Sequence, residues 1–436
     1  MDFRTAENYL YSLGNEVETM KLGLENIRTL LAAIGNPQNN YKKVQVAGTN
    51  GKGSVCAFLD SICVRAGIKT GLYTSPHLVS ITERVKVDGA DINEEDFGRL
   101  ATRVREASEK LVGEGRLEHV PTFFEQVTAI ALLAFAEAKV ELAILETGLG
   151  GRFDAVTAAN AEITAITRID LDHQEYLGDT IEKIAAEKAA IIRADSKVVL
   201  THQKKNIERV LTGRCREVGV KLIWASADVR INDEPAIVPV LSGSITTAKA
   251  HYSLLEFWNM LGRHQFENAS VAVGVAEVLQ NEGYGITNTD ISLGLETAEH
   301  PGRLEYFEGF LLDGAHNVGG ARALTDFLDD FVTQPITLVF GAMKEKNVAE
   351  IAGLLFPRAE KIVLTQPENS RAMTAEQLTA FVPSHVHADS IFQTESVTEA
   401  LDKAKNVKSP NGIVLVTGSL YLIGEVKRIL KAERAV

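Results

Sequence analysis

Cysteine is scarce in this sequence, and its scarcity excludes one class of protein. The 436 residues include three cysteines, Cys56, Cys63 and Cys215. A sparse and odd count is typical of a reducing compartment and argues against a disulfide framework. Cys56 and Cys63 stand seven residues apart in a helix-like stretch, so we interpret them as small core side chains that face the same way.

Positive charge and long apolar runs are also scarce. The 45 Lys and Arg residues are outnumbered by 58 Asp and Glu, which gives a net charge of −13. This balance argues against nucleic acid or an anionic membrane as the main partner, but it permits a local basic pocket for a small anion. The longest apolar stretch, Val127–Ala138, falls short of the roughly 20 residues that span a bilayer, so we expect a buried helix there. Residues 1–14 show no apolar signal core. We therefore expect a cytoplasmic enzyme.

The length and the order of apolar segments predict more than one domain. A chain of 436 residues is expected to form two or three domains, at roughly 100–200 residues each. Strand-like and helix-like patterns alternate from Val44 onward, and the alternation restarts after Pro301-Gly302. Such alternation predicts an α/β fold with mainly parallel sheets covered by helices. We place the boundary near residue 298, between a first domain of residues 1–297 and a second of residues 298–436.

The expected elements follow from these patterns. In the first domain we expect strands within 43–51, 69–76, 142–151 and 163–172, and helices over 54–67, 127–138 and 180–192. In the second domain we expect strands within 309–317, 336–343, 361–366 and 412–419, a helix over 319–331 and a final helix. Residues 226–252 form an irregular, β-rich stretch that indicates little about function.

The stretch Val46–Val55, VAGTNGKGSV, contains the parts of a phosphate-binding loop in a shifted register. The standard loop has the pattern G-x-x-x-x-G-K-[ST], whereas here Lys52 is followed by Gly53 and the hydroxyl comes one place later, at Ser54. Glycines let backbone N–H groups turn inward, and a helix N-terminus carries positive partial charge. Lys52 adds a point charge and Ser54 a hydroxyl for magnesium. We interpret the stretch as a phosphate loop; a plain strand–helix turn is the alternative.

Two further predicted strands end in groups that suit a metal or a phosphate. Glu146 follows four apolar residues, at the carboxyl end of a strand, where ligands bind in open α/β sheets. A bound magnesium would neutralise this carboxylate; the alternative is that Glu146 caps its own glycine turn. His173 follows Asp170 and Asp172 at the end of the next strand. We interpret His173 as a metal ligand or a phosphate contact.

Lys188 occupies an unusual position on the predicted helix 180–192. It lies on the apolar face, four residues after Ile184 and three before Ile191. Burial would lower the pKa of this lysine, and a neutral amine can react with carbon dioxide to give a carbamate, which acts as a carboxylate and could bind magnesium. The spacing alone favours the simpler alternative, an ammonium group that reaches solvent from the edge of the stripe.

The second domain carries its own polar cluster. Asp313, His316 and Asn317 stand after a predicted strand and before a predicted helix, and Arg303 lies just past the boundary. Asn268 lies near the start of a helix in the first domain. Arg303 and Asp313 could reach a nucleotide on the first domain if the two domains face each other. A helix cap explains Asp313 or Asn317 about as well.

Six blocks of the sequence together resemble one family. AGTNGKGS, TSPHL, ETGLGGRFDA, LDHQEYLG, EKAAII and DGAHN resemble, in family order, the folylpolyglutamate synthases, which in many bacteria are also dihydrofolate synthases and belong to the ATP-dependent Mur ligase superfamily. The resemblance runs from Lys21–Ile27 to Thr417–Val426. It implies a P-loop NTPase-like Mur ligase domain with a folate or pterin pocket, followed by a Rossmann-like C-terminal ligase domain. It also implies ATP and two magnesium ions as cofactors and a folate or dihydropteroate and L-glutamate as substrates. We expect a monomer.

The resemblance further implies roles for individual residues. The ATP contacts would be Gly48, Thr49, Asn50, Gly51, Lys52, Gly53, Ser54, Asn268, Arg303 and Asp313. The magnesium ligands would be Ser54, Glu146 and His173, and Lys188 would be carbamylated and support the second ion. The catalytic residues would be Lys52, Lys188 and His316. The folate or pterin pocket would include Lys21, Leu22, Gly23, Leu24, Ser75, Pro76, His77, Thr122, Phe123, Phe124, Glu125, Phe153, Asp154 and Ala155. His316 and Ser419 would lie near the incoming glutamate or the γ-phosphate.

Two positions depart from the family pattern. A segment that often contains Asp-Lys-Asp is Glu345-Lys346-Asn347 here, which leaves the role of Lys346 open. The block Glu-Lys-Ala-Gly-Ile is Glu-Lys-Ala-Ala-Ile, a change of one small residue beside Lys188.

The resemblance predicts an amide ligase that activates a carboxylate as an acyl phosphate. ATP would phosphorylate the folate carboxylate, and the amine of L-glutamate would displace phosphate. A P-loop kinase or NTPase and a cell-wall ligase of the same superfamily are the alternatives. A dinucleotide-dependent dehydrogenase is disfavoured because Gly51-x-Gly53 is followed by Cys56 where that fingerprint requires glycine. The sequence does not decide between folylpolyglutamate synthase, dihydrofolate synthase or both activities, nor the folate form or the polyglutamate length.

Overall fold

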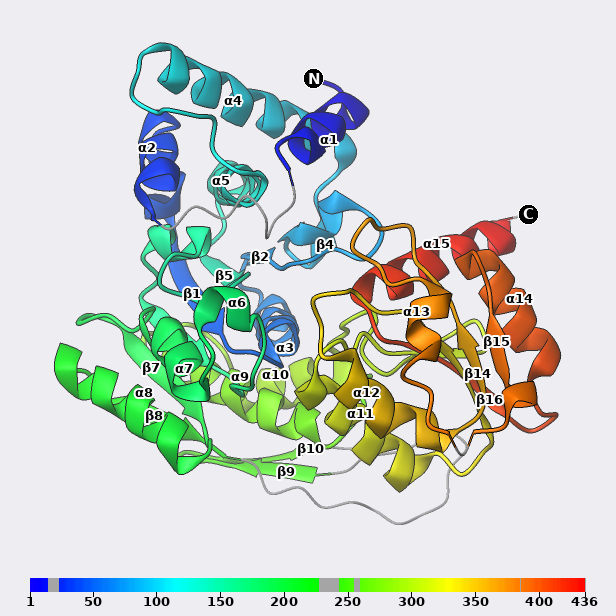
Figure 1. The fold of residues 1–436 in the computed structure, drawn as a ribbon. Coiled ribbons are helices and arrows are strands. Elements are labelled where there is room, and N and C mark those ends of the chain that lie inside the picture. Colours follow the sequence, from blue (N-terminus) through cyan, green and yellow to red (C-terminus); the bar gives the residue numbers. More distant parts are fainter. Residues whose placement is uncertain (15–22, 227–242, 255–258, 385, 436) are drawn as a thin grey trace. The chain divides into compact units, whose positions relative to one another are not determined.

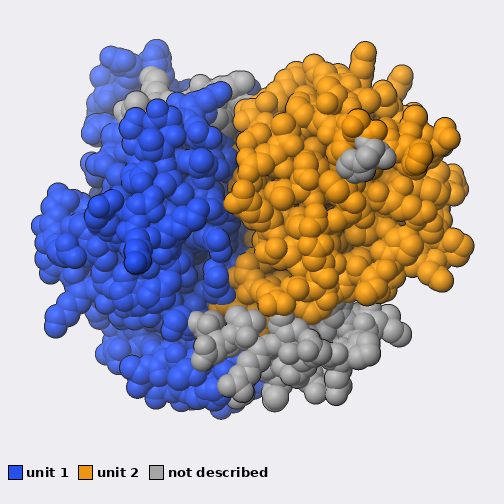
Figure 2. Space-filling model, turned by 60° about the horizontal axis from the view of Figure 1, so that its bottom comes forward, with its two compact units in different colours: residues 1–228, 244–254, 267–298 blue, residues 229–243, 255–266, 299–436 orange. Residues whose placement is uncertain are grey.

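The computed structural model describes residues 1–14, 23–226, 243–254, 259–384 and 386–435 (Figure 1). The chain divides into two compact units (Figure 2). Unit 1 comprises Met1–Asp228, Ser244–Leu254 and Glu267–Ala298, and unit 2 comprises Val229–Gly243, Leu255–Phe266 and Glu299–Val436. The assignment of residues 1–297 to ATP binding and of residues 298–436 to ligation stays a prediction.

Unit 1 is built on an eight-stranded sheet. Its strand order is β4-β3-β2-β5-β1-β6-β7-β8. The strands are β1 (Lys42–Ala47), β2 (Thr70–Tyr73), β3 (Val85–Val87), β4 (Ala90–Asp91), β5 (Leu142–Glu146), β6 (Ile163–Ile166), β7 (Lys197–Thr201) and β8 (Leu222–Ala225). The six strands from β2 to β8 in that order are parallel, and β3 and β4 are antiparallel additions at one edge. The expected α/β fold with a mainly parallel sheet is confirmed.

Helices cover this sheet. They are α1 (Phe3–Ser12), α2 (Glu25–Ala33), α3 (Lys52–Arg65), α4 (Glu94–Gly113), α5 (Phe123–Ala138), α6 (Gln174–Leu177), α7 (Ile181–Ala189), α8 (Lys205–Val218), α9 (His264–Asn281) and α10 (Asn288–Thr297). The short strands β9 (Gly243–Thr246) and β10 (His251–Leu254) pair in the part of the irregular stretch that is described.

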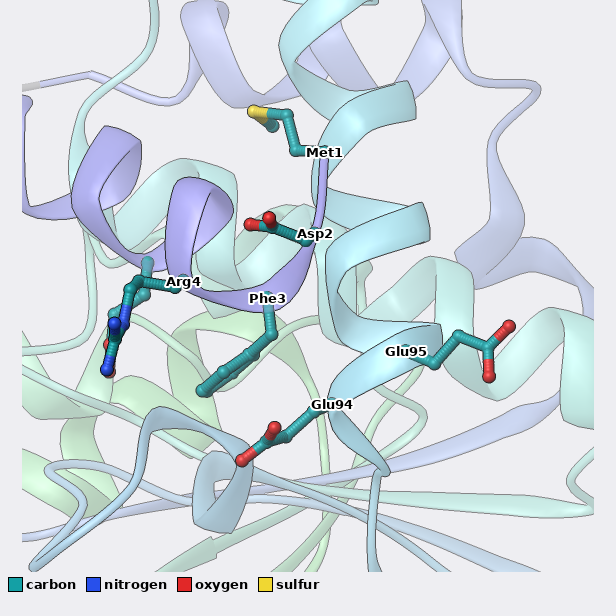
Figure 3. Close-up of a pocket in the computed structure, with 7 residues that line it drawn as sticks. Met1, Asp2, Phe3, Arg4, Glu94 and Glu95 are labelled. Atoms are coloured by element: carbon teal, nitrogen blue, oxygen red, sulfur yellow. The ribbon is translucent and has the colours of Figure 1, made fainter.

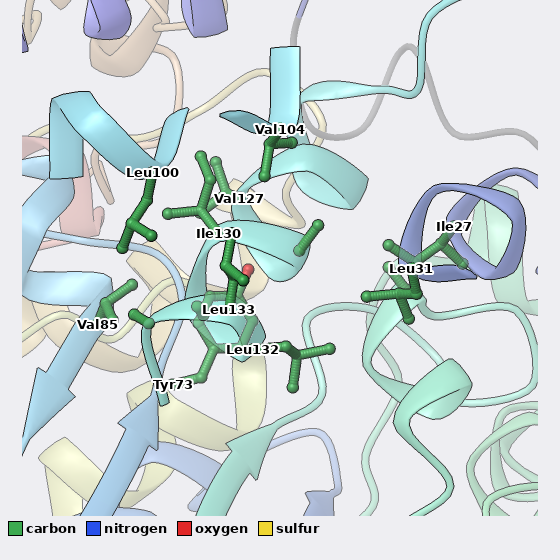
Figure 4. Packing of buried hydrophobic residues seen from close by; sticks show 14 of the residues in the cluster. Ile27, Leu31, Tyr73, Val85, Leu100, Val104, Val127, Ile130, Leu132 and Leu133 are labelled. Atoms are coloured by element: carbon green, nitrogen blue, oxygen red, sulfur yellow. The ribbon is translucent and has the colours of Figure 1, made fainter. Parts of the chain in front are cut away.

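The apolar stretch Val127–Ala138 forms most of α5, and nearly all of it is buried. Figure 4 shows Val127 and Ile130 of α5 beside Leu100 and Val104 of α4, within a cluster that also includes Tyr73 of β2. Burial of each such side chain stabilises the fold by roughly 1.5–3 kcal/mol. The expected buried helix is confirmed. Among the described helices, none combines the length and the apolar composition that a membrane span requires.

The three cysteines are free thiols inside the protein. Cys56 and Cys63 lie on α3 and Cys215 lies on α8, and all three are buried. The interpretation of Cys56 and Cys63 as core residues is confirmed.

Unit 2 contains a six-stranded sheet with the order β11-β12-β16-β13-β14-β15. The strands are β11 (Glu305–Phe307), β12 (Phe310–Leu312), β13 (Ile336–Phe340), β14 (Ala359–Leu364), β15 (Ile391–Gln393) and β16 (Ile413–Thr417). All except β11 are parallel. The helices are α11 (Val318–Phe331), α12 (Val348–Leu355), α13 (Ala375–Thr379), α14 (Val397–Val407) and α15 (Leu420–Ala435). The strands β11 and β15 were not among those that the sequence predicted.

Candidate active site

The glycine-rich loop connects β1 to α3. Two of its glycines, Gly48 and Gly51, lie so close to neighbouring side chains that a larger residue would overlap them. Gly48 has φ +153°, and a Cβ there would lie 1.8 Å from Thr167 Oγ1. Gly51 caps α3 with φ +88°, and a Cβ there would lie 2.1 Å from Asn268 Oδ1. Asn268 of α9 and Thr167 after β6 therefore bound the loop on two sides. The helix begins at Lys52, two residues earlier than the sequence predicted.

Two amides of the loop already have protein partners. The N–H groups of Thr49 and Asn50 both donate to the carbonyl oxygen of Arg168, at 2.8 and 3.2 Å. The first amides of a helix have no partner inside the helix, and in α3 these follow Gly51. A phosphate would therefore meet the amides of the first turn of α3 rather than those of Thr49 and Asn50. Lys52 lies in that first turn, and its Nζ donates to Thr49 O at 3.2 Å.

Asp170 fixes the loop to the segment that follows β6. Thr49 Oγ1 donates to the Asp170 carbonyl oxygen at 3.0 Å and accepts from the Asp170 N–H at 3.1 Å. Asn50 Nδ2 donates to Asp170 Oδ2 at 3.1 Å. Sequence reasoning placed Asp170 at a strand end but gave it no role. The sequence signal that could have found it is the pair of aspartates, Asp170 and Asp172, after the strand-like segment.

Glu146 ends β5, beside Val46 of β1 in the register of the sheet. Its carboxylate is 6% exposed and accepts the Ser75 N–H at 3.0 Å. Another carboxylate holds the glycine turn that follows Glu146, so a cap by Glu146 itself is not needed to explain that turn. Asp154 accepts the N–H of Leu149 at 2.8 Å. Glu146 instead connects β5 to the TSPHL loop.

Asp154 is a structural anchor of the GLGGRFDA segment. It is buried, and it also accepts the N–H of Val156 at the start of the short helix Ala155–Ala159. Burial raises its pKa to about 6, against the opposing backbone hydrogen bonds and the charge of Lys52. Its neighbour Phe153 is 40% exposed. Of these two predicted pocket residues, Phe153 is thus the one that can meet a substrate ring.

Lys188 is buried, and its amine contacts the glycine-rich loop. The residue is 4% exposed, and Nζ donates to the Gly48 carbonyl oxygen at 2.8 Å. The alternative of an ammonium group that reaches solvent is wrong. The reason is the close approach of α7 to the glycine turn: a Cβ on Gly151 would lie 2.7 Å from Glu187 O and 3.2 Å from Lys188 Cα. The glycine turn therefore packs directly against the backbone of α7 at Lys188.

Three charged side chains lie near the amine of Lys188 and influence its pKa. Burial lowers the pKa of Lys188 to about 7, and the nearby charge of Lys52 lowers it further, whereas Asp172 and Asp154 oppose the shift. A folded-state pKa near 7 means that much of the amine is neutral at physiological pH. Lys52, Asp154 and Asp172 thus lie close enough to Lys188 to influence its ionisation.

The pKa of Lys188 predicts a pH dependence of stability. The folded-state pKa of about 7 lies below the ordinary value of 10.5, so between these values the unfolded chain binds the extra proton and stability rises with pH. We expect the free energy of unfolding of the wild type, minus that of Lys188→Met, to increase from pH 7 to 9, by up to about 1.4 kcal/mol per pH unit. Urea unfolding in carbon dioxide-free buffer measures it. A difference that stays constant with pH would contradict the prediction.

His173 is positioned by the carboxylate before it. It has φ +49°, and its N–H donates to Asp172 Oδ1 at 2.9 Å, while its Nε2 lies 3.8 Å from Asp172 Oδ2. The same aspartate interacts electrostatically with Lys188. Asp172 was not predicted as a site residue, and it connects the predicted metal ligand to the buried amine.

The donor set suits a metal that arrives with a nucleotide. The described residues contain no group of three or more His, Cys, Asp or Glu side chains that could hold a metal ion. The predicted ligands Ser54, Glu146 and His173 provide one hydroxyl, one carboxylate and one imidazole. Magnesium is commonly bound by one or two carboxylates together with waters and substrate phosphates. The residues fit a magnesium ion shared with ATP, and they do not form a complete protein cage.

An aromatic and imidazole cluster joins the TSPHL loop to α5 and α1. His77 accepts from Arg84 Nε at 2.8 Å through Nδ1, and its Nε2 lies 3.2 Å from Tyr11 OH. Burial, together with the charge of Arg84, lowers the pKa of His77 to about 3, so the imidazole is neutral. Tyr11 stacks on Phe123 with ring centroids 5.8 Å apart. The structure thus brings two predicted pocket residues together through Tyr11 and Arg84, which no sequence motif indicated.

Other predicted pocket residues have clear structural roles. Thr122 and Glu125 form a reciprocal capping box at the start of α5. Phe124 lies against Gly148, where a Cβ would approach its ring to 2.5 Å. Leu24 is buried at the start of α2, after Gly23, which has φ +151°. Lys21 and Leu22 lie outside the described residues.

In unit 2, Asp313 follows β12 and organises the DGAHN segment. Its oxygens accept the N–H groups of Leu304 and Ala315 at 3.0 and 2.9 Å. Burial raises the pKa of Asp313, and the charge of Arg303 opposes the shift. The helix-cap interpretation is confirmed for Asn317, whose side chain accepts the Gly320 N–H at the start of α11.

The ends of β12 and β16 lie side by side in unit 2 and bring two motifs together. His316 Nδ1 lies 2.8 Å from the Gly314 carbonyl oxygen. A Cβ on Gly314 would lie 2.3 Å from Leu420 Cδ2. Ser419 Oγ accepts the Tyr421 N–H at 3.1 Å. The segments DGAHN and TGSLY, which contain His316 and Ser419, are therefore neighbours.

A separate pocket lies where α1 meets α4 (Figure 3). Its volume is about 670 Å³, and it is lined by Met1, Asp2, Phe3, Arg4, Glu7, Glu94 and Glu95. None of these is a predicted site residue. The lining is mostly acidic, which does not suit ATP or a folate.

Comparison with protein families identifies both parts of the chain. The Mur ligase middle domain matches residues 46–276, and the glutamate ligase domain of Mur ligases matches residues 302–420. The chain is 35% identical, over 98% of its length, to a probable bifunctional folylpolyglutamate synthase/dihydropteroate synthase of Haloferax volcanii, but it spans about half of that protein (50%). It is 33% identical to the dihydrofolate synthase/folylpolyglutamate synthase of Bacillus subtilis, and the match covers 94% of this chain and 96% of that protein.

Solved structures show the same fold with ligands bound. The Mycobacterium tuberculosis folylpolyglutamate synthase complexed with ADP and AMPPCP matches with a TM-score of 0.89 and 27% identity, over 98% of both chains. Escherichia coli FolC in complex with DHPP and ADP matches with a TM-score of 0.86 and 28% identity, over 100% of this chain and 99% of that one. A bifunctional folylpolyglutamate synthase/dihydrofolate synthase with Mn, AMPPNP and L-glutamate bound matches with a TM-score of 0.83 and 27% identity, over 99% and 98%.

The matches extend along both units and agree with the six sequence blocks. The two Mur ligase domains occur in order, and the Bacillus subtilis relative and the structure with Mn, AMPPNP and L-glutamate bound are both named for folylpolyglutamate synthase and dihydrofolate synthase. The chain belongs to the folylpolyglutamate synthase/dihydrofolate synthase family of Mur ligases.

Proposed function

We propose that this chain uses ATP to ligate L-glutamate to a folate, and that it also ligates L-glutamate to dihydropteroate. The observation that carries the proposal is the buried amine of Lys188, hydrogen-bonded at 2.8 Å to the carbonyl oxygen of Gly48 in the phosphate loop. A kinase or NTPase that only transfers phosphate has no evident use for such an amine. The bound ADP, DHPP and L-glutamate of the solved relatives support the same substrate classes.

The reaction proceeds in two balanced steps in this proposal. A carboxylate oxygen of the acceptor attacks the γ-phosphorus of ATP, the bond to the β-phosphate oxygen breaks, and ADP leaves. The resulting acyl phosphate is then attacked at its acyl carbon by the amine of L-glutamate. Inorganic phosphate leaves with the bonding electrons, the amine loses a proton, and an amide forms. Positioning and electrostatic stabilisation are the main contributions that a protein makes to phosphoryl transfer.

The residues of the phosphate loop supply that electrostatic stabilisation. The first turn of α3 presents amides and the positive end of its helix dipole, and Lys52 adds a full charge. Asn268 and Thr167 hold the loop in place through their contacts with Gly51 and Gly48. Magnesium, bound with ATP by Ser54, Glu146 and His173, would screen the charge of the phosphates.

We further propose that Lys188 is carbamylated. Its neutral amine attacks carbon dioxide, a C–N bond forms, and one proton is released to give a carbamate. The carbamate would add a negative charge to the group that contains Lys52, Asp154 and Asp172, and it would complete the ligands of a second magnesium ion. The lowered pKa of Lys188, to about 7, supports the reaction because only the neutral amine is nucleophilic.

The acceptor would bind at the cluster of Tyr11, His77 and Phe123, and the exposed ring of Phe153 would be a further contact for it. Neutral His77 and the stacked rings offer an apolar, hydrogen-bonding surface that suits a pterin. In unit 2, His316 and Ser419 would bind the incoming amino acid. A monomeric state and a cytoplasmic location stay predictions from the sequence.

A single assay tests the proposed function. The purified chain is supplied with ATP, magnesium and labelled L-glutamate, and dihydropteroate or tetrahydrofolate is offered separately. We expect glutamate incorporation with both acceptors, and ADP release that depends on the acceptor and on glutamate. Incorporation with one acceptor alone would restrict the activity to that one. Phosphorylated product without an amide would favour a kinase, and no incorporation with either acceptor would refute the proposal.

A further inference from the structure

Arg371 of unit 2 lies in the segment between β14 and α13, and none of the predicted site residues belongs to that segment. Its guanidinium makes two polar contacts with side chains from two other segments. Nη1 donates to Glu345 Oε1 at 2.9 Å, and Nη2 donates to Tyr421 OH at 2.7 Å. The group also lies 5.4 Å from the centroid of the Tyr421 ring. Glu345 follows β13 and Tyr421 follows β16, so three segments meet at this arginine.

The guanidinium is held in a mostly enclosed position with donor capacity left over. The Arg371 side chain is 18% exposed, and its Nε is buried without a hydrogen-bond partner among the described residues. A guanidinium has five N–H donors, and the contacts to Glu345 and Tyr421 use only two of the nitrogens. Glu345 shows that Nη1 can bind a carboxylate oxygen, the group that an acidic ligand would present.

The surrounding backbone places this arginine at the carboxyl edge of the parallel sheet. A Cβ on Gly341 would lie 2.9 Å from Thr365 O, and a Cβ on Gly418 would lie 2.7 Å from Gly341 O. The segments after β13, β14 and β16 are therefore in close contact at that edge. Ligands bind in open α/β sheets at the carboxyl ends of the strands. Ser419, predicted to lie near the incoming amino acid, is hydrogen-bonded to Tyr421 at the same edge.

We propose that Arg371 binds a carboxylate of the incoming amino acid, with Tyr421 and Glu345 as positioning residues for its guanidinium. The inference rests on the proposed function, because it assigns a contact for the amino acid that this function consumes. Arginine suits the role because its planar fork matches a carboxylate with two parallel hydrogen bonds. A dicarboxylic amino acid would exchange with the Glu345 carboxylate at Nη1 or add to the unused donors. The guanidinium of Arg371 then balances the negative charge of the bound carboxylate.

The test compares Arg371→Gln with a matched control in the full chain. The control is Arg358→Gln, which removes another arginine of unit 2 that forms an ion pair, with Asp329. We expect Arg371→Gln to raise the KM for L-glutamate on the order of 10- to 100-fold, because a charge-assisted bidentate contact is lost. The KM for ATP and kcat at saturating glutamate should stay near the wild-type values. Arg371→Lys, which keeps the charge and loses the fork, should give an intermediate KM.

A binding measurement keeps the inference separate from the proposed function. Calorimetric titration of L-glutamate into the chain with a non-hydrolysable ATP analogue should show binding to the wild type and to Arg358→Gln, and weakened binding to Arg371→Gln. Competition by L-glutamine, which lacks the side-chain carboxylate, distinguishes the two carboxylates: an unchanged inhibition constant in Arg371→Gln assigns the side-chain group, and a raised one assigns the α-carboxylate. If the wild type binds glutamate but forms no amide, the proposed function fails alone. Equal glutamate affinity in the wild type and Arg371→Gln, or no binding to either, overturns the inference.

Discussion

Replacing Lys188 by alanine is expected to lower the turnover of glutamate ligation by at least about 100-fold. The side chain is buried beside Lys52, and its Nζ contacts Gly48 of the phosphate loop. Alanine removes the amine, and with it the carbamate that we propose as support for a second magnesium ion. It also leaves the Gly48 carbonyl without its donor. The measurement is incorporation of labelled glutamate at saturating ATP and acceptor.

Added short carboxylic acids should restore part of the activity of Lys188→Ala, because they can enter the cavity and replace the carboxylate. The wild type supplied with ¹³C-labelled carbon dioxide should show a carbamate signal that Lys188→Ala lacks. Lys183→Ala serves as the control, since Lys183 is on the same helix but is exposed and paired with Asp179. A correctly folded Lys188→Ala with full activity would refute the role. Loss of activity without rescue, together with no carbamate signal in the wild type, would refute carbamylation. Lys188 would then act only by holding the phosphate loop through its hydrogen bond to Gly48 O.

Replacing Gly48 by alanine is expected to weaken ATP binding by roughly 100-fold and to destabilise the fold by about 1–3 kcal/mol. The residue has φ +153°, and the new methyl group would meet Thr167 Oγ1 at 1.8 Å. That hydroxyl donates to Asn50 O at 2.7 Å, so relief of the overlap breaks a contact that shapes the loop. The Gly48 carbonyl that accepts from Lys188 would move as well. Calorimetric titration with ATP and urea unfolding measure the two effects.

The matched control for this glycine is Gly213→Ala on α8. No atom lies within 4 Å of a Cβ at Gly213, so alanine should leave ATP affinity unchanged and stabilise the helix by about 0.5–1 kcal/mol. The double change Gly48→Ala with Thr167→Ala helps to separate the two causes: it removes the overlap with the hydroxyl at 1.8 Å, leaves the closer-than-usual contact with the Thr167 Cβ at 3.0 Å, and keeps the unfavourable φ. Wild-type ATP affinity in Gly48→Ala would show that the loop does not carry the phosphates.

The order of elements and the phosphate loop could be predicted because their signals are local. Apolar alternation and the glycines around Lys52 lie within a few residues of one another, and a strand–turn–helix fixes the shape of such a segment. The boundaries differ by little: α3 begins at Lys52 rather than near Ser54. The same local patterns placed Glu146 at the end of a strand, which the structure reproduces. The strand expected over 163–172 is shorter than predicted: β6 ends at Ile166, and His173 lies seven residues later, at the start of α6.

Roles that depend on distant partners could not be predicted in the same way. Thr49 and Asn50 were predicted to contact ATP, and no pattern in the sequence indicated that their amides donate to Arg168. Asp154 was predicted as a pocket residue, and no pattern indicated that its oxygens also hold the turn around Leu149. Each partner comes from another segment or from the inside of a turn, where the spacing of residues in the sequence carries no signal.

The sequence by itself determined the two parallel sheets, the glycine-rich loop between a strand and a helix, and the family, because periodicity and motif order are properties of neighbouring residues. The tertiary structure alone decided that Lys188 is buried. Spacing left that side chain at the edge of an apolar stripe, whereas in the fold it is 4% exposed and its Nζ donates to Gly48 O. Its contact with Gly48 joins residues 140 positions apart, because the fold brings α7 next to the loop that follows β1. The charge of an amine depends on what surrounds it in space, and that surrounding is a property of the fold.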